Sequence, residues 1–444
     1  MNADPTIGPA SNAVVTMDRL WQDLMALAEI TEPGRPYTRR SFSDRFLDGR
    51  AWIEARLRDA GMSIRYDTAA NLIGRLEGTE SGLPTIAIGS HSDTVPSGGR
   101  FDGILGVVAG IEVIRTLRER RIALRHTIEI IDFLAEEPSE YGLSCVGSRA
   151  MSGHLPSTML ALQNPEGETL RQAIARIGGR PEELSLARRS DIAAFLELHI
   201  EQGRVLESST TDLGIVTSIV GIVRLEIEFT GSADHAGATP FDLRRDALVA
   251  AAVTVTAVRT IGERFAVAGR GYFIATTGVI EAEPNAANVV PRLARLVVEA
   301  RAEDAALLEA FVVEIDRASV TAAVDASVER SVFRQLSDSL PAHCDLRLRD
   351  HMATAALALG LSAVSMASGA GHDASFIAQI APIAMAFVPS KEGRSHCPEE
   401  WTDPQQCADG AALLLETLLR VDADEAFDHQ HSAPGIARGP HDEQ

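Results

Sequence analysis

The chain has 444 residues, of which 45% are hydrophobic, so it is long enough to build two domains with substantial cores. Its formal net charge of -21 at pH 7 argues against nucleic acid or an anionic membrane as a partner, because both require a basic face. We therefore expect a small-molecule substrate.

The cysteines and the first residues of the chain bear on its compartment. The four cysteines form no CxxC pair, and a chain of this size does not need disulfides. The first fifteen residues lack a basic region followed by an apolar core, and the sequence contains no run of 18 apolar residues. These features predict a cytoplasmic protein that is neither exported nor inserted into a membrane.

Two amphipathic patterns, over residues 13–29 and 41–60, predict helices that cover a sheet. Further along, four apolar runs predict buried parallel strands, and each is followed by a His or a carboxylate. The runs are Thr85–Gly89, Thr127–Leu134, Ala194–Leu198 and Ala381–Val388. The residues that follow them are His91 and Asp93, then Glu136 and Glu137, then His199, Glu201 and Gln202, and finally His396. Because the carboxyl ends of parallel strands form the ligand-binding edge of such sheets, we expect these side chains to lie together.

Asp102 follows the first strand after a glycine-rich turn and precedes a helical pattern over residues 103–120. Two interpretations of this aspartate are open. It is placed to cap the helix, since Asp is a favoured N-cap residue. It is also placed to bring a further carboxylate to the edge where the strand-end residues gather.

The pattern changes between the third and fourth strands. Residues 220–230 alternate as a half-exposed strand does, and helical and strand patterns follow in a β-α-β-β-α order. We therefore predict an α/β protein whose catalytic domain, residues 1–211 and 331–422, has a mixed, mainly parallel sheet. An α+β domain, residues 212–330, is inserted into it. Residues 423–444 have little to bury and are expected to be disordered; a metal tract at His429 and His431 is the less favoured interpretation.

The strand-end residues form a mixed nitrogen and oxygen set suited to Zn²⁺, Mn²⁺, Co²⁺ or Ni²⁺. Three histidines with Asp102 and one of the paired glutamates exceed the ligands that one open catalytic zinc needs. Two metals ~3.5–4 Å apart, bridged by one carboxylate, account for this surplus and activate a shared water. Of Glu136 and Glu137, one can bind metal while the other acts as general base, which is typical of metal-assisted hydrolysis.

Seven motifs carry a resemblance to a known family. They are HSDTVPSGGRFDG, AEEPSEYGLSCVGSRAMSG, LELHIEQG, GSADHAGATPFDLRRDA, NAANVVP, SGAGHDA and SHCPEE, which occur in this order between about residues 85 and 400. The sequence resembles the dinuclear-metal amidohydrolases of the M20 metallopeptidase superfamily. More narrowly, it resembles the hydantoinase/carbamoylase branch, which includes N-carbamoyl-L-amino acid hydrolases, allantoate amidohydrolase and β-ureidopropionase.

The resemblance implies roles for the strand-end residues and for the inserted domain. It implies Asp102 as a bridging metal ligand and Glu136 as the general base. The other implied ligands are His91, Glu137, His199 and His396. It also implies that the inserted domain forms the interface of a homodimer.

Four further residues have implied roles at the substrate. His235, in the HAGATP motif, is implied to hydrogen-bond the developing oxyanion in a neighbouring active site. Asn288 and Arg301 match positions that hold the substrate carboxylate, where Arg offers a planar fork. Gln202 is a further candidate substrate contact. The chain departs from the family at Ile222, where many members have Gln, which removes an amide that could bind a polar substrate.

The function that we expect is metal-dependent hydrolysis of the C–N bond of an N-carbamoyl-L-amino acid. One alternative is allantoate or another ureido acid as the substrate. A second is a non-catalytic binding protein on the same scaffold, although it would be expected to have lost the base or a ligand. A third is a cysteine hydrolase that uses Cys397, but this cysteine lacks an activating base of its own.

Overall fold

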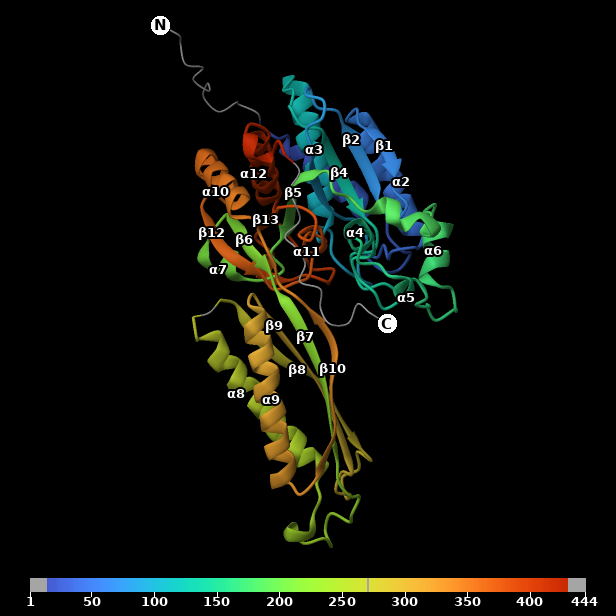
Figure 1. Ribbon diagram of the computed structural model, residues 1–444, viewed down its shortest axis with the longest axis vertical. Helices are drawn as coiled ribbons and strands as arrows, with labels where there is room; N and C mark the ends of the chain where they lie inside the picture. The colour runs from blue at the N-terminus through green and yellow to red at the C-terminus, as the bar shows by residue number, and fades with distance from the viewer. Residues whose placement is uncertain (1–13, 270, 430–444) are drawn as a thin grey trace. The chain divides into compact units, whose positions relative to one another are not determined.

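The computed structural model describes residues 14–269 and 271–429, and the chain divides into two compact units. Unit 1 holds the described residues of Met1–Thr217, Cys344–Met366 and His372–Gln444. Unit 2 holds those of Ser218–His343 and Ala367–Gly371. The chain is mixed α/β, which confirms the predicted fold class (Figure 1).

A nine-stranded sheet contains all four of the predicted apolar strands. Its order is β1-β2-β4-β3-β5-β13-β6-β11, and β12 pairs with β6. The strands are β1 (Ser63–Tyr66), β2 (Leu72–Leu76), β3 (Thr85–His91), β4 (Ile128–Phe133), β5 (Ile192–Ile200), β6 (Leu213–Ile219), β11 (Ala342–His343), β12 (Ala363–Ser368) and β13 (Ile383–Val388). The predicted four, β4, β3, β5 and β13, are adjacent and mutually parallel. Their carboxyl ends therefore share one edge.

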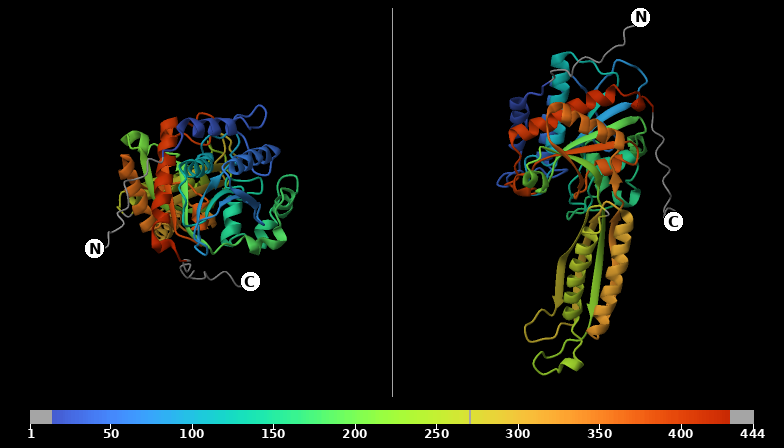
Figure 2. Two further views of the ribbon diagram at one scale, coloured as in Figure 1. Left: turned by 90° about the horizontal axis from the view of Figure 1, so that it is seen from above. Right: turned by 90° about the vertical axis from the view of Figure 1, so that its left-hand side faces the viewer.

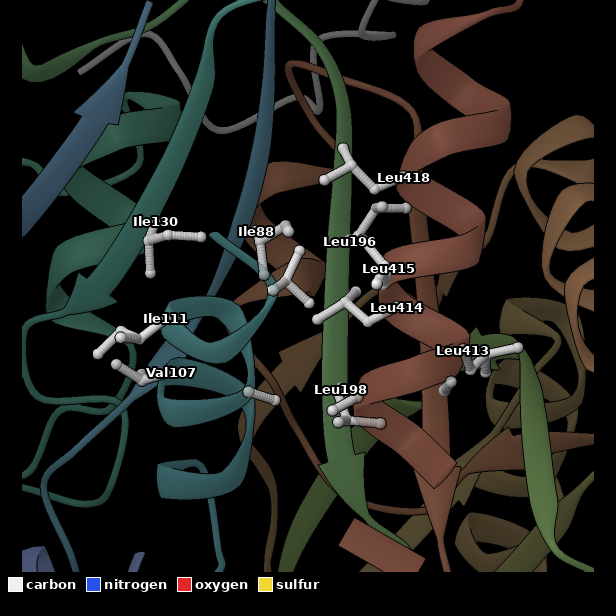
Figure 3. Close-up of a cluster of buried hydrophobic side chains, with 14 of the residues drawn as sticks. Ile88, Val107, Ile111, Ile130, Leu196, Leu198, Leu413, Leu414, Leu415 and Leu418 are labelled. Carbon is white, nitrogen blue, oxygen red and sulfur yellow. The ribbon is translucent and has the colours of Figure 1, made fainter. Parts of the chain in front are cut away.

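The main core of unit 1 lies between this sheet and five helices. These helices are α1 (Met17–Ala28), α2 (Asp44–Asp59), α3 (Ile104–Arg120), α10 (Leu346–Leu359) and α12 (Pro404–Asp422). Figure 3 shows side chains of β3, β4 and β5 packed with side chains of α3 and α12, including Ile88, Ile111, Ile130, Leu196 and Leu414. The burial of these apolar side chains is what holds the strand ends in place.

A second core cluster in unit 1 gathers around the segment that follows β4. Its short helices are α4 (Val146–Ser152), α5 (Ser157–Leu160), α6 (Leu170–Arg176) and the 3-10 segment η1 (Pro181–Ala187). The remaining short elements of the unit are α7 (Val205–Ser209), α11 (Ala374–Ile377), η3 (Lys391–Gly393) and η4 (Glu425–Phe427).

The strands reach further than their apolar runs. β3 continues to His91, which pairs in register with Phe133 of β4, and β5 continues past His199, which pairs with Phe387 of β13. Both histidines are therefore ladder residues rather than loop residues. A backbone paired within a sheet holds a side chain more precisely than a loop does.

Asp102 does not cap α3, so that interpretation is wrong. The helix begins at Ile104 with Gly103 as its N-cap, and no side chain makes a capping hydrogen bond. Gly103 has a φ of 67°, and a Cβ on it would lie 2.3 Å from Nε2 of His91. Only glycine fits this approach to the histidine, and the turn leaves the Asp102 carboxylate free for other partners.

Unit 2 has a four-stranded antiparallel sheet in the order β10-β7-β9-β8. Its strands are β7 (Gly221–Thr230), β8 (Phe273–Glu283), β9 (Leu293–Ala302) and β10 (Glu329–Ser339), and its helical elements are α8 (Ala247–Ala266), α9 (Ala305–Asp325) and η2 (Phe241–Leu243). Figure 2, right, shows the two long helices running along the strands. The predicted edges, at residues 212 and 330, differ from the bounds of this unit, because β10 pairs along its length with β7.

The expectation of disorder from residue 423 is wrong for the described part of that tail. The segment after α12 forms η4, and Phe427 is only 2% exposed within the main core of unit 1. Asp424 pairs with His351 at 2.8 Å and Asp428 with Arg125 at 2.7 Å, so ion pairs and the buried ring of Phe427 together hold this segment. Residues 430–444, including His431, lie outside the described residues. Among the described helices, none has the length and apolar character to span a bilayer.

Candidate metal centre

The structure brings five sequence-predicted residues of unit 1 together as two groups of potential ligands. One group is His91, Asp102 and His199, and the other is Asp102, Glu137 and His396. Within each group the ligand atoms lie within 4.8 Å of one another. Asp102 belongs to both groups, so its carboxylate lies between them.

The two oxygens of Asp102 face different histidines. Oδ1 lies 3.1 Å from Nε2 of His199 and 3.8 Å from Nε2 of His91. Oδ2 lies 2.9 Å from Nε2 of His396, which is in turn 3.3 Å from Oε1 of Glu137. A carboxylate with one oxygen toward each ligand group has the arrangement needed to bridge two cations.

The other ring nitrogens of the two strand histidines face backbone carbonyl oxygens. Nδ1 of His91 lies 3.1 Å from the carbonyl oxygen of Asp93, and Nδ1 of His199 lies 2.9 Å from that of Ile200. A carbonyl only accepts hydrogen bonds, so each Nδ1 carries a proton and Nε2 is the atom directed at Asp102. This is the usual orientation of a metal-binding histidine, which supports a fit of these residues to a divalent cation.

The electrostatics of Asp102 and His396 agree with this arrangement. Burial alone would raise the pKa of Asp102, but hydrogen bonds with His199 and His396 hold it well below its usual value. The hydrogen bond to Asp102 raises the pKa of His396 to about 9. A protonated His396 therefore balances the carboxylate charge of Asp102, and a divalent cation would take the place of that proton.

Glu136 lies beside the first group. Its Oε2 is 3.6 Å from Nε2 of His91, and its Oε1 accepts a long contact from Sγ of Cys145 at 3.6 Å. Burial raises the pKa of Glu136 to about 8, and the carboxylates of Asp373 and Asp93 add to this effect while His91 opposes it. A carboxylate with a pKa near the operating pH is suited to taking up and releasing a proton.

Asp93 holds the backbone of the paired glutamates, Glu136 and Glu137. Its Oδ1 accepts a hydrogen bond from the backbone N–H of Glu136 at 3.3 Å, and its Oδ2 accepts one from that of Glu137 at 3.2 Å. The sequence placed Asp93 at the end of its strand without a role. The structure shows that its carboxylate sets the backbone from which both glutamates project.

Gln202 and His396 both have left-handed backbone conformations, with φ of 57° and 58°. Such strain in non-glycine residues is typical of functional sites. Nε2 of Gln202 donates a hydrogen bond to Oδ2 of Asp102 at 2.9 Å, so this amide supports a candidate ligand. Its neighbour Glu201 accepts hydrogen bonds from the backbone of Val205 and Leu206 and stabilises the start of α7.

Sequence reasoning missed several buried polar residues near the centre. Glu197 and His372 form a third potential ligand group with His199, and the ring of His372 contacts that of His199 with centroids 4.6 Å apart. Glu197 lies two residues before His199 and so projects from the same face of β5, a period-2 signal that could have identified it. His372 and Asp373 belong to the SGAGHDA motif, but the motif alone gave them no partner.

In unit 2, two of the predicted substrate residues lie on neighbouring loops. The loop of His235 follows β7, the loop of Asn288 follows β8, and Figure 1 shows both loops at the same end of the sheet. The two loops are joined by a hydrogen bond of 2.9 Å from the N–H of Ala236 to the carbonyl oxygen of Asn288. Nδ1 of His235 accepts hydrogen bonds from the backbone N–H groups of Gly237 and Ala238 at 3.1 Å each. This leaves the proton of the neutral ring on Nε2, where it can be donated.

Arg301 lies at the opposite end of the same sheet. It is the ninth residue of β9, so it is about 27 Å along the strand from Leu293 at a rise of ~3.4 Å per residue. The side chain of Arg301 contacts the carbonyl oxygen of Gly369 at 2.6 Å and Glu299 at 2.7 Å. Unit 2 of a single chain therefore does not bring Arg301 together with His235 and Asn288.

The raised pKa values predict how the stability of metal-free protein depends on pH. Glu136 and His396 bind protons more tightly in the folded state, so stability should fall as pH rises through their folded pKa values of about 8 and about 9. We expect the Tm of protein treated with chelator to decrease between about pH 6 and about pH 9. Tryptophan fluorescence reports this change for unit 1, since Trp21, Trp52 and Trp401 all lie there.

Two comparisons make this prediction specific. The variant Glu136→Gln has one titrating group fewer, so its Tm should change less steeply over the same pH range. Added Mn²⁺ or Zn²⁺ should also flatten the profile, because a bound metal keeps its ligands deprotonated. A Tm that stays constant or rises with pH in metal-free protein would contradict these assignments.

Comparison with known proteins gives a consistent family assignment. Residues 87–420 match the model of peptidase family M20/M25/M40. An N-carbamoyl-L-amino acid amidohydrolase from Geobacillus stearothermophilus is 37% identical over 407 residues, covering 91% of this chain and 98% of the relative. A ureidoglycolate hydrolase from Arabidopsis thaliana is 33% identical and covers 94% of this chain and 89% of the relative.

A solved structure agrees with the sequence relatives. The hydantoinase/carbamoylase family amidase from Burkholderia multivorans has a TM-score of 0.86 and 33% identity, and the match covers 93% of this chain and 100% of that one. The predicted family and enzyme class are thus confirmed. This chain belongs to peptidase family M20/M25/M40, within its hydantoinase/carbamoylase amidases, and is an amide-hydrolysing enzyme.

Proposed function

We propose that the enzyme hydrolyses the carbamoyl C–N bond of an N-carbamoyl-L-amino acid with two divalent metal ions per chain. The observation that carries the proposal is the position of Asp102 between two ligand groups, with Glu136 beside one of them. Four of the relatives are named for this activity. The complete set of candidate ligands and the presence of Glu136 argue against a non-catalytic binding protein.

The chain's residues divide into two metal-holding sets. His91 and His199 with Oδ1 of Asp102 would hold one ion, and Glu137 and His396 with Oδ2 of Asp102 the other. This nitrogen and oxygen set suits Zn²⁺, Mn²⁺, Co²⁺ or Ni²⁺. When bound, the ions supply an activated water and polarise the amide carbonyl.

Glu136 carries the proton in the proposed reaction. Its backbone is held by Asp93, and its carboxylate faces the first ligand group at His91. In the proposed step, Glu136 takes a proton from the attacking water as the new C–O bond forms at the carbamoyl carbon. It then gives this proton to the leaving nitrogen as the C–N bond breaks. The products are the free amino acid and carbamate, which decomposes to ammonia and carbon dioxide.

His235 and Asn288 would act together at the substrate. The backbone of the His235 loop holds the ring in the form that carries its proton on Nε2, so the neutral side chain can donate to a developing oxyanion. Because Arg301 lies at the other end of the sheet, one small substrate cannot contact both ends of the unit 2 of one chain. We therefore propose a homodimer in which one chain supplies His235 and Asn288 to a substrate and the other chain supplies Arg301.

The neighbours of Arg301 favour a substrate with an apolar side chain. In the register of the unit 2 sheet, Ile222 on β7 and Ile274 on β8 lie directly opposite Arg301. Side chains of directly opposite residues project from the same face. The guanidinium of Arg301 pairs with Glu299, and a substrate carboxylate would take the place of this partner. The two isoleucines offer no amide to a second ureido group.

A ureido acid remains the second candidate, because relatives include ureidoglycolate hydrolases and an allantoate amidohydrolase. For the location of the reaction we propose the cytoplasm, since all four cysteines are free thiols.

Ammonia release from a substrate panel tests the proposed function. The metal-loaded enzyme should release ammonia fastest from N-carbamoyl amino acids with apolar side chains, and more slowly from N-carbamoyl-L-aspartate, allantoate and ureidoglycolate. Ile222→Gln should shift the ratio of kcat/KM values toward allantoate. If allantoate or ureidoglycolate is hydrolysed fastest, the second candidate replaces the first. Absence of hydrolysis across the panel would refute both candidate substrate classes.

Substitution of the paired glutamates should separate their roles. Glu136→Gln should still bind two metal ions while kcat falls by roughly 10²–10⁴, the usual contribution of a positioned acid–base group. Glu137→Gln should instead weaken metal binding. Equilibrium dialysis followed by elemental analysis, together with steady-state kinetics, distinguishes the two. Reversed phenotypes would show that the pair is assigned the wrong way round.

Complementation between two inactive variants tests the shared site. His235→Ala and Glu136→Gln should each have little activity alone, and a mixture should regain activity. The reason is that a heterodimer can assemble one intact site from His235 of one chain and Glu136 of the other. Copurification of differently tagged chains must first establish that subunits exchange. Exchange without recovered activity would show that His235 does not act on a neighbour's site.

A further inference from the structure

Glu400 is a buried carboxylate close to the metal centre that belongs to neither ligand group. It lies four residues after His396. Its Oε1 accepts hydrogen bonds from the backbone N–H groups of Phe101 at 2.8 Å and Asp102 at 3.2 Å. Its Oε2 accepts a hydrogen bond from Oγ of Ser395 at 2.8 Å. One side chain thus joins the segment that carries Asp102 to the segment that carries His396.

The fit around Glu400 is close on both sides. A Cβ on Gly99 would lie 1.8 Å from Oε1 of Glu400, so only glycine allows this approach. The next residue, Trp401, packs edge-on against the ring of Phe101 with centroids 5.8 Å apart. Glu400 and Trp401 therefore hold the turn before Asp102 together, one through backbone hydrogen bonds and the other through ring packing.

The hydroxyl of Ser395 lies between two carboxylates. Its Oγ is 2.8 Å from Oε2 of Glu400 and 3.1 Å from Oδ2 of Asp102. A hydroxyl has one hydrogen and can donate it to only one of them. If the hydrogen points to Glu400, Oδ2 of Asp102 accepts one hydrogen bond fewer than if it points to Asp102.

If Oδ2 of Asp102 binds a metal ion, it cannot also accept the hydrogen bond from Ser395. A carboxylate oxygen has two lone-pair sites. Nε2 of Gln202 donates to one at 2.9 Å, and the side that faces His396 at 2.9 Å is where the second ion would bind. The hydrogen of Ser395 must then go to Glu400, which is also the nearer acceptor.

We infer that Glu400 is a positioning residue for the second metal ion, the one held by Glu137, His396 and Oδ2 of Asp102. It keeps the segments of Asp102 and His396 together and draws the Ser395 hydrogen away from Oδ2. This inference rests on the proposed two-metal function and adds a residue that does not touch the ions.

The variant Glu400→Gln tests the inference with a side chain of the same shape. The glutamine oxygen can still accept from the two backbone N–H groups, but its NH₂ group then faces Ser395 and donates to it. The Ser395 hydrogen must turn to Asp102, where it competes with the second ion. We expect the affinity of the second metal step to fall by about 10- to 100-fold, the usual effect of changing an outer partner of a metal ligand. The first step should be unchanged.

Calorimetric titration of chelator-treated protein with Mn²⁺ at about pH 8, where metal ligands are more readily deprotonated, resolves the two steps without relying on activity. Ser395→Ala removes the competing hydrogen, so adding Glu400→Gln to it should cost the second step much less than in the wild-type background. This double-mutant cycle isolates the coupling between the two side chains. If Glu400→Gln does not fold, Gly99→Ala, which pushes Glu400 aside, should give the same selective loss.

Glu201→Gln is the matched control. Glu201 is also buried and also accepts two backbone N–H groups, from Val205 and Leu206, but it stabilises α7. Its substitution should lower Tm and leave both metal steps as in the wild type. A wild-type protein with two metal steps that Glu400→Gln leaves unchanged would overturn the inference while the proposed function stands. A wild-type protein that binds no metal would refute the proposed function itself.

Discussion

The arrangement of the candidate metal centre depends on the burial of the Asp102 carboxylate. A buried charge is costly unless it is paired and hydrogen-bonded, and Asp102 is 5% exposed. His199 faces one of its oxygens, while His396 and Gln202 face the other. Two glycines near Asp102 make this packing possible. Gly103 allows His91, and Gly99 allows Glu400, to approach the turn that carries Asp102.

Sheet topology explains why these partners come from distant parts of the sequence. The four central strands are parallel neighbours, so their carboxyl ends meet at one edge. Two histidines sit within the ladders, where each is paired with a residue of one neighbouring strand. Asp93 then fixes the backbone of the paired glutamates through two N–H groups. The hydrolytic chemistry that we propose follows from this convergence of strand ends.

The sequence predicted the four central strands, because fully buried parallel strands are continuous apolar runs, and it predicted that the polar residues after these strands gather at one edge. The strand pattern alone left two interpretations of Asp102 open, a helix cap or a further carboxylate at the strand ends, because the choice depends on a left-handed turn at Gly103. The contacts of Glu400 could not be predicted from the sequence either, because its partners Phe101 and Asp102 lie almost three hundred residues earlier in the chain. Phe427 was assigned to a disordered tail because composition cannot reveal that one aromatic residue reaches the core.

We propose that the Asp102 carboxylate lies between two bound metal ions. Diffraction from crystals grown with Mn²⁺ or Zn²⁺, recorded at the absorption edge of the metal, locates the ions directly. We expect two anomalous peaks ~3.5–4 Å apart, one on each side of the Asp102 carboxylate. A single peak, or peaks that Asp102 does not join, would contradict the proposal.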